Sequence, residues 1–275
     1  MKWYPAPAKL NLFLHVVGRR ADGYHLLESV FRFIDHGDEL GFTVREDGEI
    51  RQAQPIPGLP AEQDLCIRAA RLLQQQTGCT LGADIALTKR LPMGGGLGGG
   101  SSDAATTLIA LNHLWKTGLS RDELQQLGLK LGADVPVFIF GQAAFAEGIG
   151  EILTPVSLPC PWYVVLTPPV HVSTPEIFRD EGLTRNSEPI KMRAFQNTAT
   201  RNDLQPVVCR KEPEVKRHLD WLSQFAPARM TGSGACVFAA FDSENDAQHV
   251  MQQLPDDMTG FAAKGLQDHP IYAMI

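Results

Sequence analysis

Six glycines occupy the seven positions from Gly94 to Gly100. Glycine loses more backbone freedom on folding than any other residue, so a loop this rich in glycine is costly unless its bare backbone serves a purpose. Directly after the loop, Ser101, Ser102 and Asp103 offer side chains that can cap a helix. A glycine-rich turn followed by a capped helix constrains this chain more than any other stretch does.

The segment after the glycines is predicted to be an amphipathic helix. Apolar residues recur there at helical spacing and share one face, namely Ala104, Leu108, Leu111 and Trp115. The start of such a helix presents unpaired N–H groups and the positive end of the helix dipole, both of which attract phosphate. A flexible linker would not lead at once into a capped helix, so we predict a phosphate-binding loop.

The dinucleotide fingerprint of Rossmann folds fits this loop poorly. Gly94, Gly96 and Gly99 match G-x-G-x-x-G, but so dense a glycine run would match it by chance. That motif also needs an acidic residue after a second strand about 20 residues later. Residues 118–123 instead begin another helix.

The Walker A motif fails for a different reason. Gly95 and Gly100 have its spacing, yet Ser101 stands where the motif places a lysine. Lys89 and Arg90 precede the loop and could help to hold an anion, although paired basic residues beside a loop more often face solvent. The main cation must come from elsewhere in the chain.

Composition narrows the class of protein. A chain of 275 residues, 44% hydrophobic, can form one large or two modest domains. The net charge of -6 argues against nucleic acid as a partner and permits a phosphorylated small molecule. Five scattered cysteines without a C-x-x-C pair indicate reduced thiols, and no signal peptide or membrane-spanning run is evident. We therefore expect a cytoplasmic protein and leave its oligomeric state open.

The N-terminal region is predicted to be a β-hairpin. Residues 8–17 alternate in polarity, residues 18–23 have turn chemistry, and residues 24–34 form the returning strand. Lys9 lies on the face opposite the leucines of the first strand. A lysine in a strand is usually a solvated edge charge, so Lys9 alone does not indicate a site.

Asp134 is the second isolated charge of interest. A capping box at Ser120 opens a helix that ends near Gly132, and Asp134 then stands directly before the apolar residues 135–140. Burying a carboxylate costs several kcal/mol unless a cation or ligand meets it. Asp134 therefore either bonds its own backbone in a helix-to-strand turn or pairs with a cation, for which Lys9 is our candidate.

The overall pattern predicts an α+β protein of two lobes. The first half is rich in β patterns, and the second alternates helices with strands. A proline-rich segment places the boundary so that residues 1–155 form an N-terminal domain with the glycine-rich loop and residues 156–275 a C-terminal domain. Residues 270–275 are expected as a last strand that could return to the N-terminal domain.

Several segments together resemble the GHMP kinases, the superfamily of galactokinase, homoserine kinase, mevalonate kinase and phosphomevalonate kinase. Residues 92–105 resemble its signature loop, and residues 7–12, 22–25, 132–136 and 232–235 resemble its other motifs in the expected order. Residues 232–235 alone would more often be a tight turn before a strand than part of an anion site. These five matches, in the expected order over nearly the whole chain, are far more specific than any one of them.

The resemblance implies a two-lobed GHMP kinase fold, with an ATP-binding N-terminal domain and a C-terminal α/β sandwich domain. It also implies ATP as the phosphoryl donor with Mg²⁺. Asp134 would accept the proton of the attacking hydroxyl, and Lys9 would pair with Asp134 and offset charge on the moving phosphoryl group. The residues assigned to ATP are Pro92, Met93, Gly94, Gly95, Gly96, Leu97, Gly98, Gly99, Gly100, Ser101 and Ser102. Ser101 or Ser102 would reach the metal.

Within the superfamily, the resemblance is greatest to the kinases that phosphorylate a cytidine diphosphate ester of methylerythritol on its 2-hydroxyl, in the non-mevalonate isoprenoid pathway. It implies that His25 reads the cytosine, that Tyr24 and Phe178 stack, and that Asn11 contacts the substrate. Aromatic side chains are more often buried in a core than stacked on a ligand. Asp64 departs from the asparagine expected near the adenine, which leaves the adenine contacts open.

Three alternatives remain at this point. Homoserine or mevalonate kinase is the runner-up among the kinases, and residues 23–25 argue for a nucleobase reader instead. A non-catalytic nucleotide-binding module would keep the loop but would not need Lys9 and Asp134 together. A Rossmann oxidoreductase would need an early βαβ unit, which the N-terminal hairpin argues against.

Overall fold

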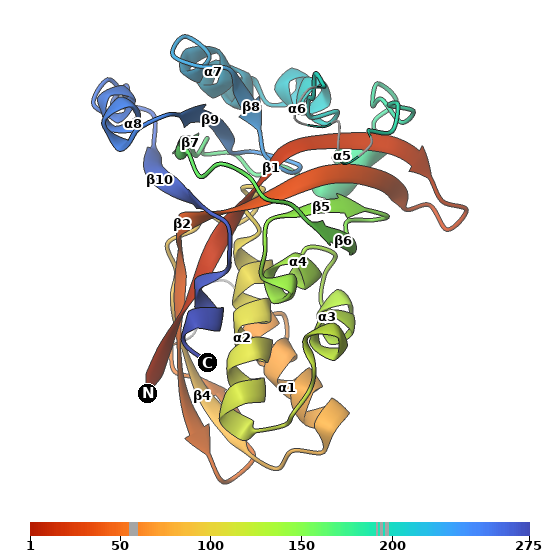
Figure 1. Cartoon of the computed structure of the whole chain (residues 1–275), viewed down its shortest axis with the longest axis vertical. Helices are drawn as coiled ribbons and strands as arrows, with labels where there is room; N and C mark the ends of the chain where they lie inside the picture. Colours follow the sequence, from red (N-terminus) through yellow and green to blue (C-terminus); the bar gives the residue numbers. More distant parts are fainter. Residues whose placement is uncertain (55–59, 191, 193–194, 196–197) are drawn as a thin grey trace.

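The computed structural model describes residues 1–275 apart from 55–59, 191, 193–194 and 196–197. Two long antiparallel strands, β1 (Lys2–Arg19) and β2 (His25–Arg45), run from the foot of the molecule to its upper part (Figure 1). The predicted hairpin is confirmed, and both strands extend beyond their predicted bounds. The register shifts where Pro7 pairs with Gly37 and Ala8 pairs with Ile34, so the extra residues of this bulge lie in β2, and a Cβ on Gly37 would lie 2.2 Å from the Ala6 carbonyl oxygen.

The N-terminal lobe packs helices onto a sheet. Its sheet adds β3 (Ile50–Gln52), β4 (Gly82–Thr88), β5 (Ala144–Glu147) and β6 (Ile152–Pro155) to the long strands. Its helices are α1 (Leu65–Thr77), α2 (Gly99–Trp115), α3 (Arg121–Leu129) and α4 (Val135–Phe140). The apolar stripe predicted for α2 is buried in this lobe's core, and the predicted capping box at Ser120 is present.

The C-terminal lobe continues the sheet above (Figure 1). It contains β7 (Trp162–Leu166), β8 (Ala228–Met230), β9 (Val237–Phe241) and β10 (Gly260–Leu266). Its helices are α5 (Thr174–Arg179), α6 (Gln205–Lys211), α7 (Pro213–Leu222) and α8 (Glu244–Met251). β10 pairs with both β7 and β2, so one hydrogen-bonded sheet, ordered β3-β4-β2-β10-β7-β9-β8, joins the two lobes.

The end of the chain differs from its prediction as a strand. Pro270–Ala273 form a 3₁₀ helix, η2, and His269 caps it by accepting a hydrogen bond from the Ile271 amide. Pro270 explains the difference, because its fixed φ and missing N–H suit the first turn of a helix better than a strand. The segment does pack on the N-terminal lobe, where Ile271 is buried and the Tyr272 hydroxyl donates to the Ile139 carbonyl.

The two short helices that flank the site both carry a proline in their first turn. The apolar segment after Asp134 is helix α4 rather than a strand, with Pro136 in its first turn. α5 begins at Thr174, with Ser173 as its N-cap residue. Across the part of the chain that the structure describes, no helix is both long and apolar enough to cross a bilayer.

Candidate functional site

A cleft of about 770 Å³ opens between the two lobes. The cleft is lined by the long hairpin, the glycine loop, the start of α4, helix α5 and the turn before β9. Predicted site residues meet in it, namely Lys9, Asn11, Tyr24, His25, Gly96, Ser101, Asp134 and Phe178. The other residues assigned to ATP belong to the same loop, next to Gly96 and Ser101.

Lys9 and Asp134 converge in this cleft. The Lys9 Nζ lies 3.3 Å from Asp134 Oδ2, with the lysine side chain 2% exposed and the aspartate 38% exposed. Lys9 Nζ also donates to Asn11 Oδ1 at 2.6 Å and to the Gly96 carbonyl at 3.0 Å. Two hydrogen bonds and one ion pair therefore compensate the buried ammonium charge.

The backbone fixes both ends of this ion pair. The Lys9 amide donates to the Leu97 carbonyl at 2.9 Å, which ties β1 directly to the glycine loop. Asp134 occupies the N-cap position of α4, yet its side chain makes no capping hydrogen bond. The alternative interpretation of Asp134, a turn aspartate bonded to its own backbone, is therefore wrong. Its carboxylate faces Lys9 and the cleft instead.

The glycine loop lies in close backbone contact with the C-terminal lobe. A Cβ on Gly96, whose φ is +77°, would come within 2.3 Å of the Thr231 carbonyl oxygen. The Cys236 amide donates to the Gly95 carbonyl at 3.0 Å. The turn before β9 therefore packs against the glycine loop and holds it in position. The sequence of the turn alone did not reveal this role.

Helix α2 starts inside the glycine run. Its N-cap is Gly98, in the left-handed conformation, so the expected caps Ser101, Ser102 and Asp103 were wrong. Only a residue without a Cβ enters that conformation cheaply, which lets the helix begin before the serines. Among the hydrogen bonds of the described residues, none is donated by a backbone amide of residues 94–101. These donors suit an anion.

The two serines after the loop differ in their surroundings. Ser102 is fully buried and donates its hydroxyl to the Pro7 carbonyl at 2.7 Å. Ser101 instead lines the cleft. Of the two serines, Ser101 is therefore the one available to a molecule in the cleft.

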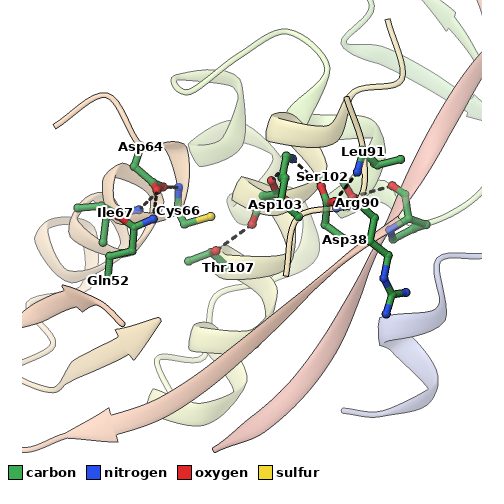
Figure 2. A network of polar contacts seen from close by, with 12 residues as sticks. Asp38, Gln52, Asp64, Cys66, Ile67, Arg90, Leu91, Ser102, Asp103 and Thr107 are labelled. Carbon is green, nitrogen blue, oxygen red and sulfur yellow. Dashed lines mark hydrogen bonds and ion pairs between the residues drawn. The ribbon is translucent and has the colours of Figure 1, made fainter. Parts of the chain in front are cut away.

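Lys89 does not offer a free charge to an anion. Its Nζ pairs with the buried carboxylates of Asp38, at 2.5 Å, and Asp103, at 2.8 Å. Asp38 also accepts hydrogen bonds from the Arg90 and Leu91 amides, as Figure 2 shows. This buried cluster fixes the chain just before the glycine loop, and the Arg90 side chain pairs with Glu39 on the surface.

Asp103 should make stability depend on pH. Burial raises the pKa of Asp103 from 3.8 to about 7, against the opposing charge of Lys89. Between these two values the folded state holds a proton that the unfolded state has lost, so stability falls as pH rises. Asp103→Asn removes this penalty. We expect its unfolding free energy, relative to wild type, to rise by about 2 kcal/mol between pH 5 and pH 8 in urea titrations. A constant difference between the two proteins would contradict the shifted pKa.

Asp64 has a structural role. One carboxylate oxygen accepts from the Cys66 amide at 2.7 Å and caps α1, while the other accepts from Gln52 at 2.8 Å (Figure 2). Both asparagine and aspartate serve well at this position of a helix. The departure from the expected asparagine is thereby explained, and Asp64 does not contribute to the cleft wall.

The far end of the cleft is aromatic. The rings of His25 and Phe178 stack with their centroids 4.9 Å apart and 27° between planes. Burial, followed by the charges of Arg185 and Arg19, lowers the pKa of His25. Tyr24 is 60% exposed at the same end. One flat polar ring beside two aromatic side chains suits a planar ligand.

The Asn11 side chain is held in place by two buried neighbours. Its Oδ1 accepts from Lys9, and its Nδ2 donates to Ser29 Oγ at 2.7 Å. The backbone N–H of Asn11 donates to Thr231 Oγ1 and so ties β1 to the turn before β9. Ser29, Thr231 and Arg185 were missed from the sequence. They lie far along the chain from the residues that they contact, and no local motif indicates them.

Models of known families match both lobes of the chain. The GHMP kinases N terminal domain matches residues 64–142, and the GHMP kinases C terminal domain matches residues 186–259. Together they cover more than half of the chain. They include the glycine loop, Asp134 and the turn before β9.

Relatives with a curated name match over nearly the full length. The chain is 61% identical to 4-diphosphocytidyl-2-C-methyl-D-erythritol kinase of Aromatoleum aromaticum, over 97% of this chain and 94% of the relative. It is 60% identical to the enzyme of the same name from Thiobacillus denitrificans, over 99% and 98%.

A solved structure agrees with the sequence relatives. The crystal structure of a 4-(cytidine 5'-diphospho)-2C-methyl-D-erythritol kinase superposes with a TM-score of 0.83 and 32% identity, covering 96% of this chain and 99% of that one. The two-lobed fold, the ordered motifs and these matches lead to one conclusion: the chain belongs to the GHMP kinases and is itself a kinase.

Proposed function

We propose that the chain transfers the terminal phosphoryl group of ATP to the 2-hydroxyl of 4-diphosphocytidyl-2-C-methyl-D-erythritol, a step of isoprenoid precursor synthesis. The observation that carries this proposal is the Lys9–Asp134 pair beside unpaired loop amides, in a cleft whose far end is aromatic. Relatives about 60% identical over almost the whole chain bear the name of this enzyme.

Phosphoryl transfer requires alignment and charge neutralisation more than covalent chemistry. In the proposed mechanism the amides of the glycine loop hold the phosphates of ATP, and Asp134 accepts the proton of the attacking hydroxyl. Lys9 orients the carboxylate and offsets charge on the transferred group. Its bond to the Gly96 carbonyl couples the position of the base to that of the loop.

The residues present fit a magnesium ion that arrives with the nucleotide. Among the described residues, no group of three or more His, Cys, Asp or Glu side chains is placed to hold a metal. Mg²⁺ needs few protein ligands when substrate phosphates and water supply the others. Ser101 would be its ligand, since the Ser102 hydroxyl is bonded to Pro7. When bound, the ion would neutralise charge on the phosphates.

The nucleobase end of the cleft distinguishes this substrate from mevalonate and homoserine. Neither of those acceptors contains a planar base for His25, Tyr24 and Phe178 to contact. A non-catalytic binding module has no use for a carboxylate paired with a buried lysine at the phosphate loop.

Residues 1–155 and 156–275 remain our proposed domain division, and a cytoplasmic location remains a prediction.

A panel of acceptors tests the proposed function directly. The protein is incubated with ATP, Mg²⁺ and one of three alcohols: the cytidylyl ester of methylerythritol, mevalonate or homoserine. Mass spectrometry then detects the phosphorylated product. We expect phosphate on the cytidylyl ester alone. Faster phosphorylation of either other alcohol would replace the proposed substrate.

His25→Ala separates acceptor binding from ATP binding. We expect the acceptor KM to rise about tenfold, the scale of one lost hydrogen bond with its stacking, while the ATP KM changes little. His113→Ala is the matched control, because His113 is exposed on α2. Equal changes in both KM values would count against a role for His25 in reading the base.

A further inference from the structure

Arg185 is fixed in place beside His25. Its Nε donates to His25 Nε2 at 3.3 Å, although the two residues lie 160 positions apart in the chain. Its remaining nitrogens donate to the carbonyls of Phe178 at 2.9 Å, Asp180 at 2.7 Å and Leu183 at 3.2 Å. The guanidinium is thus held by the same segment that supplies Phe178 to the cleft.

This contact decides where the His25 proton lies. An arginine side chain has N–H donors and no acceptor, and it does not lose its proton in proteins. The nitrogen that faces it must therefore accept, which leaves His25 Nε2 without a proton. A neutral imidazole then carries its proton on Nδ1. A protonated ring would place a second N–H against the guanidinium.

We propose that Arg185 is a positioning residue that fixes His25 as the neutral tautomer protonated on Nδ1, so that the ring presents one donor to the nucleobase. This inference rests on the proposed function, in which His25 reads the base. His25 lines the cleft and Arg185 does not, so Arg185 acts through the ring.

The fixed tautomer has a consequence for base selectivity. Cytosine presents acceptors at N3 and O2, whereas uracil carries a proton on N3. A single donor from His25 Nδ1 matches N3 of cytosine and opposes N3–H of uracil. Two donors facing each other leave both without a partner, and such mismatches discriminate strongly between ligands. Arg185 therefore favours cytosine over uracil without contact to either base.

The tautomer can be measured in the wild-type protein. Long-range ¹H–¹⁵N NMR spectra distinguish the two neutral imidazole forms from each other and from the cation, and His25→Gln identifies the signals of His25. We expect His25 at pH 7 to be protonated on Nδ1 alone. Protonation on Nε2, or a fully protonated ring, would overturn the proposal. This measurement needs no substitution at Arg185.

Arg185→Met tests the effect on selectivity. We expect the ratio of kcat/KM values for the cytidylyl and uridylyl esters to fall about tenfold, the effect of one hydrogen bond, mainly through the cytidylyl KM. In a His25→Ala background, Arg185→Met should lower the ratio no further. Arg210→Met is the control, since Arg210 also tethers Asp180 but makes no bond to His25.

The results separate this inference from the proposed function. If the wild-type protein phosphorylates the cytidylyl ester and Arg185→Met keeps its full selectivity, the role of Arg185 is refuted and the proposed function stands. If the wild-type protein does not phosphorylate the ester, the proposed function fails, and the tautomer measurement still decides what Arg185 does to His25.

Discussion

Asp134→Asn is expected to lower turnover at least about a hundredfold, the usual scale for loss of a positioned general base. Asparagine has nearly the same shape but cannot accept the proton of the attacking hydroxyl. The fold should tolerate the change, because Asp134 is 38% exposed and Lys9 keeps Asn11 and the Gly96 carbonyl as partners. ATP affinity should stay nearly unchanged, since the loop amides remain in place.

Single-turnover kinetics and an ATP titration measure these two quantities separately. Asp256→Asn is the matched control, because it removes an exposed carboxylate that is not part of the cleft wall. Turnover near the wild-type value in Asp134→Asn would remove Asp134 from the mechanism. A large loss of ATP affinity would instead mean that this carboxylate helps to hold the nucleotide.

The features that sequence predicted well are local ones. The apolar stripe of α2, the capping box at Ser120 and the N-terminal hairpin depend on residues within one or two turns of each other, so spacing and side-chain chemistry suffice. The order of the family motifs along the chain indicated which residues would gather in the site. We predicted that Lys9 pairs with Asp134 because a buried carboxylate needs a cation, and the fold does place the two side chains together.

The features that sequence could not predict depend on contacts between distant segments. Lys89 was expected to face an anion or solvent, and it is instead paired with two buried carboxylates, one from β2 and one from α2. Arg185 reaches His25 from another lobe of the protein. The expected serine caps of α2 failed because Gly98 can adopt a backbone conformation that costs other residues energy. Local rules cannot weigh such tertiary alternatives.

Gly96→Ala should show whether the glycine loop depends on its close packing against the turn before β9. Gly96 has a φ of +77°, and its Cβ would lie 2.3 Å from the Thr231 carbonyl oxygen. That carbonyl also accepts from the Gly234 amide, and Thr231 is fully buried, so the turn cannot easily yield. The loop must shift instead, which moves the carbonyl that Lys9 donates to. We expect the ATP KM to rise at least about tenfold and stability to fall by about 3 kcal/mol.

Gly118→Ala is the control that separates the steric clash of Gly96→Ala from the cost of a positive φ, which both positions share. Gly118 has a similar φ of +74°, but a Cβ there meets nothing within 4 Å. Its expected cost is therefore only the left-handed conformation of alanine, about 1 kcal/mol, with kinetics unchanged. Urea unfolding and the ATP KM are measured for both variants. If the two share the same ATP KM, the loop can move off the turn before β9 without harm to nucleotide binding. A difference confined to Gly96→Ala would mean that close packing between the lobes shapes the phosphate site.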